Sequence, residues 1–169
     1  MIIWFTGQPK SGKTTLARML STELKCPWID GDVVRKLVGN NDYSYLGRVE
    51  NVNLIQEMAV VSHRHNKYCV VSAVAPFRDQ RDRFKTEHDV LEIYLKGTQV
   101  SDHHVSYYQP PLACFELDTY LFTPDVCLLS IMKKIAHENY PSNPDVGAHP
   151  SSPSPSQGLQ VLRAGTQHS

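Results

Sequence analysis

The stretch G-Q-P-K-S-G-K-T, residues 7–14, has the form G-x-x-x-x-G-K-[ST] that is typical of a phosphate-binding loop. The apolar run M-I-I-W-F-T precedes it, and Leu16, Leu20 and Leu24 follow it at helical spacing. The octet therefore has the flanking strand and helix that its chemistry requires, and a chance match inside a loop would lack them.

Each part of this octet has a task in holding a phosphate chain. Gly7 and Gly12 let the main chain approach the phosphates with its N–H groups, and the following helix N-terminus adds partial positive charge. Lys13 is expected to reach the β- and γ-phosphates of ATP, and the Thr14 hydroxyl to ligate Mg²⁺. The predicted ATP-binding residues are Gly7, Gln8, Pro9, Lys10, Ser11, Gly12, Lys13, Thr14 and Thr15.

Composition narrows the class of protein. The 169 residues are 41% hydrophobic, with 17 basic and 17 acidic side chains, so no global basic field predicts a nucleic-acid or membrane partner. Four scattered cysteines without a C-x-x-C pair indicate buried thiols rather than disulfides or zinc. The apolar start is too short for a signal peptide, and no run approaches the ~20 residues of a membrane helix, so we expect a cytoplasmic protein.

The composition changes near the C-terminus. Five of the eleven prolines lie beyond His137, and residues 151–156 read S-S-P-S-P-S. Such a segment buries too little apolar surface to offset the entropy of ordering it. We therefore expect a folded domain over residues 1–138 and a disordered Pro/Ser-rich tail over residues 139–169.

Apolar strands alternate with helical patterns in the first 138 residues. Strands are expected at 2–6, 26–29, 68–73, 90–95 and 115–117, and helices at 13–24, 32–38, 48–66, 78–86 and 124–137. This alternation, with the phosphate-binding loop, predicts an α/β fold of the P-loop NTPase, nucleotide-kinase-like type. It would have three layers, α/β/α, and a mostly parallel sheet of about five strands. Ligands of such sheets bind at the carboxyl ends of the strands.

The second expected strand runs into D-G-D-V-V-R, residues 30–35, close to where a γ-phosphate would lie. A carboxylate there can accept a proton from an acceptor hydroxyl or hold Mg²⁺ through water. Arg35 follows Asp32 by three residues, so both share a helix face and can hold an anionic acceptor beside its base. An ordinary turn with an acidic helix cap is the alternative interpretation of Asp30 and Asp32.

Three further positions are candidates for binding an acceptor. Arg48 and Asn51 lie three apart at a helix start and suit an anion together with a polar base edge, or else form a solvated first turn. Phe77 can stack on a purine or pack as an ordinary hydrophobic residue. Arg78 is the arginine nearest the third strand end, whereas Arg81 and Arg83 are expected to form surface charge pairs with neighbouring acids.

The order of these motifs resembles the adenylylsulfate kinase family. The matching blocks are W-F-T-G-x-x-x-S-G-K-T-T at 4–15, D-G-D-x-x-R at 30–35, Y-S-x-x-x-R-x-x-N at 43–51 and A-P-F-R-D-x-R-D at 75–82. L-D-T at 117–119, followed by T-P at 123–124, extends the resemblance to about residue 137. Members transfer the γ-phosphate of ATP to the ribose 3′-hydroxyl of adenosine 5′-phosphosulfate (APS). They are often homodimers, although the sequence does not give the oligomeric state.

The resemblance implies a P-loop kinase domain with a role for each candidate residue. The implied catalytic residues are Lys13, Asp30 and Asp32, with Thr14 and Asp30 at Mg²⁺, which accompanies ATP as co-substrate. Asp32 would accept the hydroxyl proton. The implied acceptor-binding residues are Asp32, Arg35, Arg48, Asn51, Phe77 and Arg78.

The chain departs from the family pattern in two places. Ala75 stands where the family commonly has a serine associated with a phosphoenzyme, so that route is excluded at this position. The basic lid of the family, R-D-x-K-G-L-Y-K-K-A-R, is absent, and residues 96–111 contain only one lysine and the pair His103–His104. Lys96 is a possible replacement cation, and the histidines are interpreted as loop residues.

Three hypotheses follow. The first is a Mg·ATP-dependent kinase acting on APS. The second keeps the kinase and changes the acceptor to a sugar, nucleoside or antibiotic hydroxyl, because the lid is shortened. The third is a nucleotide-binding regulatory module with weak or no catalysis, which the missing lid and Ala75 also motivate.

Overall fold

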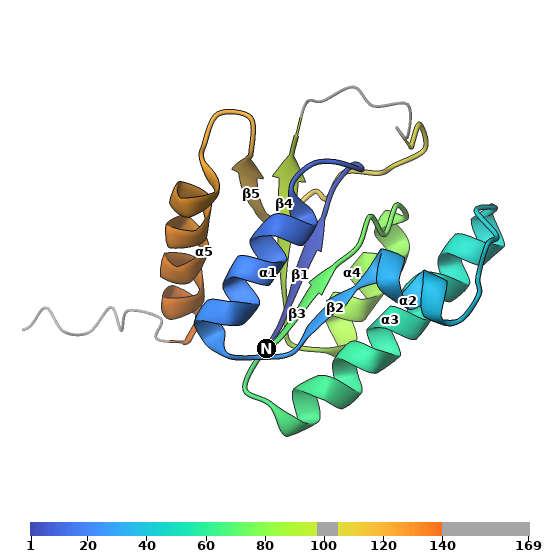
Figure 1. Ribbon diagram of the computed structural model, residues 1–169, viewed down its shortest axis with the longest axis horizontal. Coiled ribbons are helices and arrows are strands. Elements are labelled where there is room, and N and C mark those ends of the chain that lie inside the picture. Colours follow the sequence, from blue (N-terminus) through green and yellow to red (C-terminus); the bar gives the residue numbers. More distant parts are fainter. Residues whose placement is uncertain (98–104, 140–169) are drawn as a thin grey trace, which may run out of the picture.

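A computed structural model describes residues 1–97 and 105–139, which form a five-stranded parallel sheet with helices on both faces (Figure 1). The strands are β1 (Ile2–Thr6), β2 (Trp28–Asp30), β3 (Cys69–Ser72), β4 (Val90–Lys96) and β5 (Phe115–Asp118). Their order across the sheet is β2-β3-β1-β4-β5, so the strand that leads into the phosphate-binding loop lies at the centre.

The helices cover the sheet in two layers. They are α1 (Lys13–Leu24), α2 (Gly31–Leu37), α3 (Tyr45–His65), α4 (Arg78–Glu87) and α5 (Pro124–Asn139). Helices α1 and α5 lie on one face, and α3 and α4 lie on the other, as Figure 1 shows. The predicted three-layer α/β/α fold with a parallel sheet of five strands is therefore confirmed.

The central strand explains why two separate cores form. Every residue of β1 is buried, as expected for a parallel strand covered on both faces. Its side chains alternate, so Ile3 and Phe5 enter the core beneath α1 and α5. Ile2 and Trp4 enter the core on the α3 and α4 side. An apolar run of five residues thus ties both helical layers to one strand.

The boundaries differ from expectation by a few residues, for local reasons. Helix α3 begins at Tyr45 rather than 48, because the Ser44 hydroxyl caps it by accepting a hydrogen bond from the Gly47 amide at 3.3 Å. Helix α2 begins at Gly31, since the Asp30 carboxylate accepts from the amides of Asp32 and Val33. Helix α5 continues to Asn139, two residues beyond the expected end.

The expected disordered tail, residues 139–169, falls outside the described residues except for Asn139, which ends α5. The division into a kinase domain and a tail stays a prediction. Within residues 1–97 and 105–139, every helix is too short or too polar to cross a membrane. All four cysteines are free thiols; Cys69 and Cys127 are buried as expected, whereas Cys26 and Cys114 are only partly buried.

The connections of the sheet open a crevice at one edge. Strand β1 leads into α1 on one face, whereas β3 leads into α4 on the opposite face, and β1 and β3 are neighbours. Loops that diverge in this way leave space between the carboxyl ends of the two strands, which is where ligands of parallel sheets bind. The loops after β1, β2 and β3 all reach this crevice.

Candidate active site

The loop between β1 and α1 has the backbone of a phosphate cradle. Gly7 adopts a φ of 146°, and a Cβ atom on it would lie 2.6 Å from the Leu95 carbonyl oxygen, so only glycine fits here. Gly12 adopts a φ of 88° and is the N-cap of α1. The loop therefore curves tightly against β4 and presents the start of α1 to the crevice.

Lys13 is buried against the loop that it follows. Its Nζ atom donates to the Gln8 carbonyl oxygen at 2.6 Å and to Ser11 Oγ at 3.3 Å. Burial lowers the pKa of Lys13 to about 8, because desolvation disfavours the ammonium, and the negative charges of Asp32 and Asp30 oppose this shift. The ammonium is thus held at the loop, in the field of both acids.

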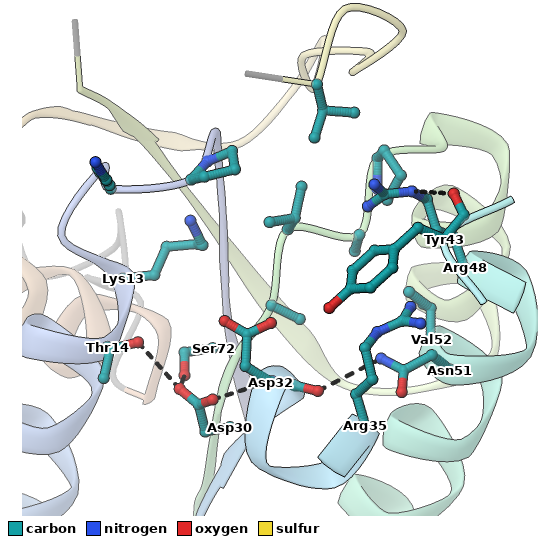
Figure 2. Close-up of a pocket in the computed structure, with 18 of the residues that line it drawn as sticks. Lys13, Thr14, Asp30, Asp32, Arg35, Tyr43, Arg48, Asn51, Val52 and Ser72 are labelled. Carbon is teal, nitrogen blue, oxygen red and sulfur yellow. Dashed lines mark hydrogen bonds between the residues drawn. The ribbon is translucent and has the colours of Figure 1, made fainter. Parts of the chain in front are cut away.

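Asp30 is the centre of a hydrogen-bond network. Its Oδ2 atom accepts from Thr14 Oγ1 at 3.0 Å and from Ser72 Oγ at 2.8 Å, and its Oδ1 atom caps α2 (Figure 2). Trp28 Nε1 donates to the same Ser72 hydroxyl at 2.9 Å. Asp30 therefore joins the phosphate-binding loop to the ends of β2 and β3.

Asp32 differs from Asp30 in having an exposed side chain in the first turn of α2. It lines a cavity of about 940 Å³ together with Lys13, Thr14 and Asp30. Figure 2 shows the Lys13 amine and the Asp32 carboxylate in this one cavity. The predicted phosphate-binding lysine and the predicted base therefore share a cleft, which the kinase interpretation requires.

The candidate acceptor-binding residues from α2 and α3 line the same cavity. Arg35 is buried, and its guanidinium donates to the Asp42 carbonyl at 2.6 Å and to Asn40 Oδ1 at 3.1 Å. Arg48 Nε donates to the Tyr43 carbonyl at 3.0 Å. Asn51 Nδ2 donates to the Gly31 carbonyl at 3.5 Å.

The two arginines also flank an aromatic ring. Tyr43, which lines the cavity, lies 4.5 Å from the Arg35 guanidinium carbon and 5.3 Å from that of Arg48, measured to the ring centroid. Asn51 Oδ1 is buried and has no hydrogen-bond partner within the described residues. The far end of the cavity thus offers two cations and an aromatic face, and Asn51 adds an unpartnered amide oxygen that is itself buried.

Phe77 and Arg78 are not among the residues that line the cavity. The Phe77 ring packs 4.5 Å from the Tyr45 ring and 5.9 Å from the Tyr107 ring, centroid to centroid. Arg78 Nε donates to the Pro110 carbonyl at 2.9 Å. Phe77 thus contacts one residue of the cavity wall, Tyr107, and the predicted contact of Phe77 and Arg78 with an acceptor stays a prediction.

The predicted ATP-binding residues divide into two groups. Six of them line the cavity: Pro9, Lys10, Gly12, Lys13, Thr14 and Thr15. Gly7, Gln8 and Ser11 support the loop instead, because Gly7 packs on Leu95 and Ser11 accepts from Lys13. The Gln8 side chain bonds to Val105, far away in the sequence.

Sequence reasoning missed several residues that shape the site. Ser72 holds Asp30, and the register of β2 beside β3, which pairs these two residues, is the feature that brings them together. Val105, Ser106 and Tyr107 form part of the cavity wall. A strand-end hydroxyl was the only local signal for Ser72, and no pattern in the sequence indicated the other three.

One expectation about the arginines after β3 was wrong. Arg81 is not a surface charge, because its side chain is 3% exposed and pairs with the equally buried Glu92, Nε to Oε1, at 2.7 Å. It also donates to the carbonyls of Ala75 and Gln109.

Lys96, a possible replacement for a lid cation, forms an ion pair with Glu116 at 2.5 Å. The residues His103 and His104 lie outside the described residues.

The donor set around Asp30 fits Mg²⁺ that arrives with ATP. Mg²⁺ in nucleotide sites uses one or two protein oxygens and completes its shell with phosphates and water, so no all-protein cage is needed. Thr14 and Asp30 supply such oxygens, 3.0 Å apart. Residues 1–97 and 105–139 contain no group of three or more His, Cys, Asp or Glu that could hold a metal unaided.

The site combines a glycine-containing phosphate-binding loop, a buried lysine and two carboxylates at the carboxyl edge of a parallel sheet. This combination defines a nucleotide-kinase-like member of the P-loop class. A sequence model of one family within this class, described as adenylylsulphate kinase, matches residues 1–104. The chain belongs to the adenylylsulfate kinase family, and the expected resemblance is confirmed.

Comparison with curated relatives supports the same family. An adenylyl-sulfate kinase of Thermodesulfovibrio yellowstonii is 33% identical over 104 residues, which cover 56% of this chain and 52% of the relative. One of Chloroflexus aurantiacus is 37% identical over 87 residues, covering 48% of this chain and 47% of the relative. The chain therefore spans about half the length of the curated relatives that it matches.

Among solved structures, the Mycobacterium tuberculosis APS kinase CysC in complex with AMPPNP and APS superimposes with a TM-score of 0.68. The match covers 80% of this chain and 96% of that one at 19% sequence identity, so it supports the fold alone. It reaches beyond residue 104, where the family model ends.

Proposed function

We propose that this chain is an ATP-dependent phosphotransferase that phosphorylates the 3′-hydroxyl of APS, with ATP as the phosphate donor and ADP as the second product. The observation that carries the proposal is the shared cavity of Lys13 and Asp32, with Arg35, Arg48 and Asn51 around its other end. One end suits a triphosphate, and the other suits a second anionic nucleotide.

Each residue has a defined role in the proposed reaction. The backbone of the phosphate-binding loop and the Lys13 ammonium hold and neutralise the triphosphate of ATP. Asp32, exposed to the cavity, accepts the proton of the attacking hydroxyl. Mg²⁺, held beside Thr14 and Asp30, would neutralise charge on the phosphates. Positioning and charge compensation then supply most of the rate, because phosphoryl transfer needs little covalent help from the protein.

The acceptor end suits the chemistry of APS. Arg48 can form charge-assisted hydrogen bonds to a phosphosulfate group, with its Nε already fixed on the Tyr43 carbonyl. Asn51 Oδ1 is buried and unpartnered, and a rotation of its side chain toward the cavity would let it accept from an amino group of a purine. Arg35 has an indirect role. Its guanidinium donates to Asn40 and Asp42 and so holds the loop that carries Tyr43.

An assay of product identity tests the proposal directly. Purified full-length protein is incubated with Mg·ATP and APS, ADP release is coupled to a reporter, and the nucleotide product is identified by mass spectrometry. The expected product is APS carrying one additional phosphate. ADP release with a different alcohol and none with APS would refute the substrate and retain the kinase.

A second candidate keeps the kinase and changes the acceptor. The observation that favours it is the absence of the family's basic lid sequence from residues 96–111, where Lys96 is already paired with Glu116. If the acceptor is an uncharged alcohol such as a sugar, replacing Arg48 and Asn51 together should change the acceptor KM by less than about twofold. With APS as the acceptor, the same double variant should raise it by about a hundredfold.

A third candidate is a nucleotide-binding module with weak catalysis. Isothermal titration that detects binding of ATP and APS, combined with no product after long incubation, would favour it over both kinases. The cytoplasmic location, expected from the sequence, also stays a proposal. The dependence on Mg²⁺ and the homodimer, both implied by the family, stay proposals too.

A further inference from the structure

The segment of residues 105–110, here called the cover segment, crosses the carboxyl ends of β1 and β3 and is tied to both. Tyr108 Oη bonds to Thr6 Oγ1 at 3.0 Å, next to the end of β1. The Gln109 amide donates to the Pro76 carbonyl at 2.9 Å, beyond the end of β3. Arg81 donates to the Gln109 carbonyl at 2.6 Å. These contacts fix the C-terminal half of the segment.

The N-terminal half of the cover segment is tied to the phosphate-binding loop by one side chain. Gln8 Nε2 donates to the Val105 carbonyl at 3.0 Å, and the Val105 amide donates to Gln8 Oε1 at 3.0 Å. A carboxamide is the side chain that can satisfy both groups of a residue's backbone at once. Val105 is buried and both bonds are partly buried, so water has limited access to them.

Tyr107 lies between these two anchored halves and faces the acceptor end of the cavity. Its ring stacks on Phe77 at a centroid distance of 5.9 Å and an interplanar angle of 13°. The Arg48 guanidinium carbon lies 5.5 Å from the Tyr107 centroid and 5.3 Å from the Tyr43 centroid. Arg48 is thus bracketed by two tyrosine rings, one of which belongs to the cover segment.

We propose that Gln8, although it belongs to the phosphate-binding loop, is a positioning residue for the acceptor. By fixing Val105, it sets where Tyr107 lies, and Tyr107 in turn sets the orientation of Arg48 and forms an aromatic wall of the acceptor end. The inference rests on the proposed function in one respect: the end of the cavity at Arg48 is taken as the acceptor site.

The inference predicts that replacing a residue of the phosphate-binding loop changes the KM for APS and not the KM for ATP. A residue whose only role is to shape the phosphate-binding loop would affect ATP when it is replaced. Gln8→Leu, which keeps the size and removes both hydrogen bonds, should instead raise the KM for APS about tenfold and leave the KM for ATP within about twofold. Tyr107→Ala should raise the KM for APS similarly, whereas Tyr107→Phe, which keeps the ring, should stay near the wild type.

The matched control is Gln56→Leu, the same substitution at a partly buried glutamine on α3 that bonds only to the Gln80 carbonyl among the described residues. It should leave both KM values unchanged. The double variant Gln8→Leu/Tyr107→Ala should be no worse than either single variant, because both act through one wall. Additive effects, or an equal rise in the two KM values, would overturn the inference.

Hydrogen–deuterium exchange supplies a readout that needs no substrate. In the free protein, Gln8→Leu should speed exchange in peptides that contain residues 105–108 at least about tenfold, with β1 and β3 unchanged. Unchanged exchange at Val105 would overturn the positioning role whatever the acceptor is. Failure of the wild type to bind or phosphorylate APS, with faster exchange in the variant, would instead refute the proposed function and retain the positioning of the cover segment.

Discussion

Asp30 and Asp32 are two residues apart, yet the structure predicts different effects on stability when they are replaced. Asp30 accepts four hydrogen bonds, from Thr14, Ser72 and two amides of α2. The Asp32 side chain is exposed in the cavity. Replacing Asp30 should therefore lower stability as well as weaken the proposed Mg²⁺ site, whereas replacing Asp32 should act on the chemical step and leave stability unchanged.

The magnitudes follow from these contacts. Asp30→Ala removes the N-cap of α2, which costs about 1 kcal/mol, and leaves the buried Ser72 hydroxyl without its acceptor. A hydrogen bond to a charged group adds about 1.5–3 kcal/mol, for a total loss of roughly 2.5–4 kcal/mol. In a domain of this size, that lowers Tm by on the order of 10 °C. Asp30→Asn, which retains a capping oxygen, should lose about half as much.

Asp32→Asn should leave the free energy of unfolding within about 0.5 kcal/mol, since it is an isosteric change at an exposed side chain. Loss of the proton acceptor should lower kcat with APS by about 10²- to 10⁴-fold and leave the affinity for ATP unchanged. Thermal unfolding by circular dichroism, isothermal titration with ATP and the coupled assay measure the three quantities. A kcat within about threefold of the wild type would refute Asp32 as the base, and equal Tm losses for Asp30→Ala and Asp32→Asn would refute the network at Asp30.

Three other substitutions test the site and its support. The pKa of Lys13 is about 8 in the folded protein, below its ordinary 10.5, so between these pH values the unfolded chain binds one more proton than the folded protein. The free energy of unfolding should therefore rise by about 3 kcal/mol as the pH increases across that window. Calorimetry should detect this rise in the wild type and not in Lys13→Met. Gly7→Ala should cost about 1–3 kcal/mol and weaken ATP binding, since its Cβ would meet the Leu95 carbonyl, and unchanged melting would contradict the cradle geometry. Arg81→Leu should cost about 3–5 kcal/mol in chemical denaturation by breaking the buried pair with Glu92, and Arg81→Leu/Glu92→Leu should recover part of that loss.

Local patterns were enough to predict the elements of the fold. The strand at Ile2–Thr6 and the helix at Lys13–Leu24 have the predicted bounds. A continuous apolar run indicates a strand buried on both faces, and apolar residues at the 3.6-residue period indicate a helix, so both patterns depend only on neighbouring positions. The phosphate-binding loop was equally readable, since its glycines and lysine act through their own backbone and immediate neighbours.

Local sequence patterns did not predict which side chains contact each other across the sheet. Ser72 meets Asp30 because β2 and β3 pair in one register, although 42 positions separate them. Gln8 meets Val105 across 97 positions, and Arg81 turned from an expected surface charge into the buried partner of Glu92. The residues next to a side chain in the sequence do not determine which distant group will be its hydrogen-bond or ion-pair partner.

The amino-acid sequence therefore specified the sheet and helices, the cradle for a phosphate chain and the family, because each depends on residue type and short-range spacing. The packing of strands and helices determined which carboxylate is held by hydrogen bonds, which is exposed in the cavity, and which segment lies beside Arg48. Those outcomes depend on contacts between distant positions, and such contacts are settled when the two cores close around β1.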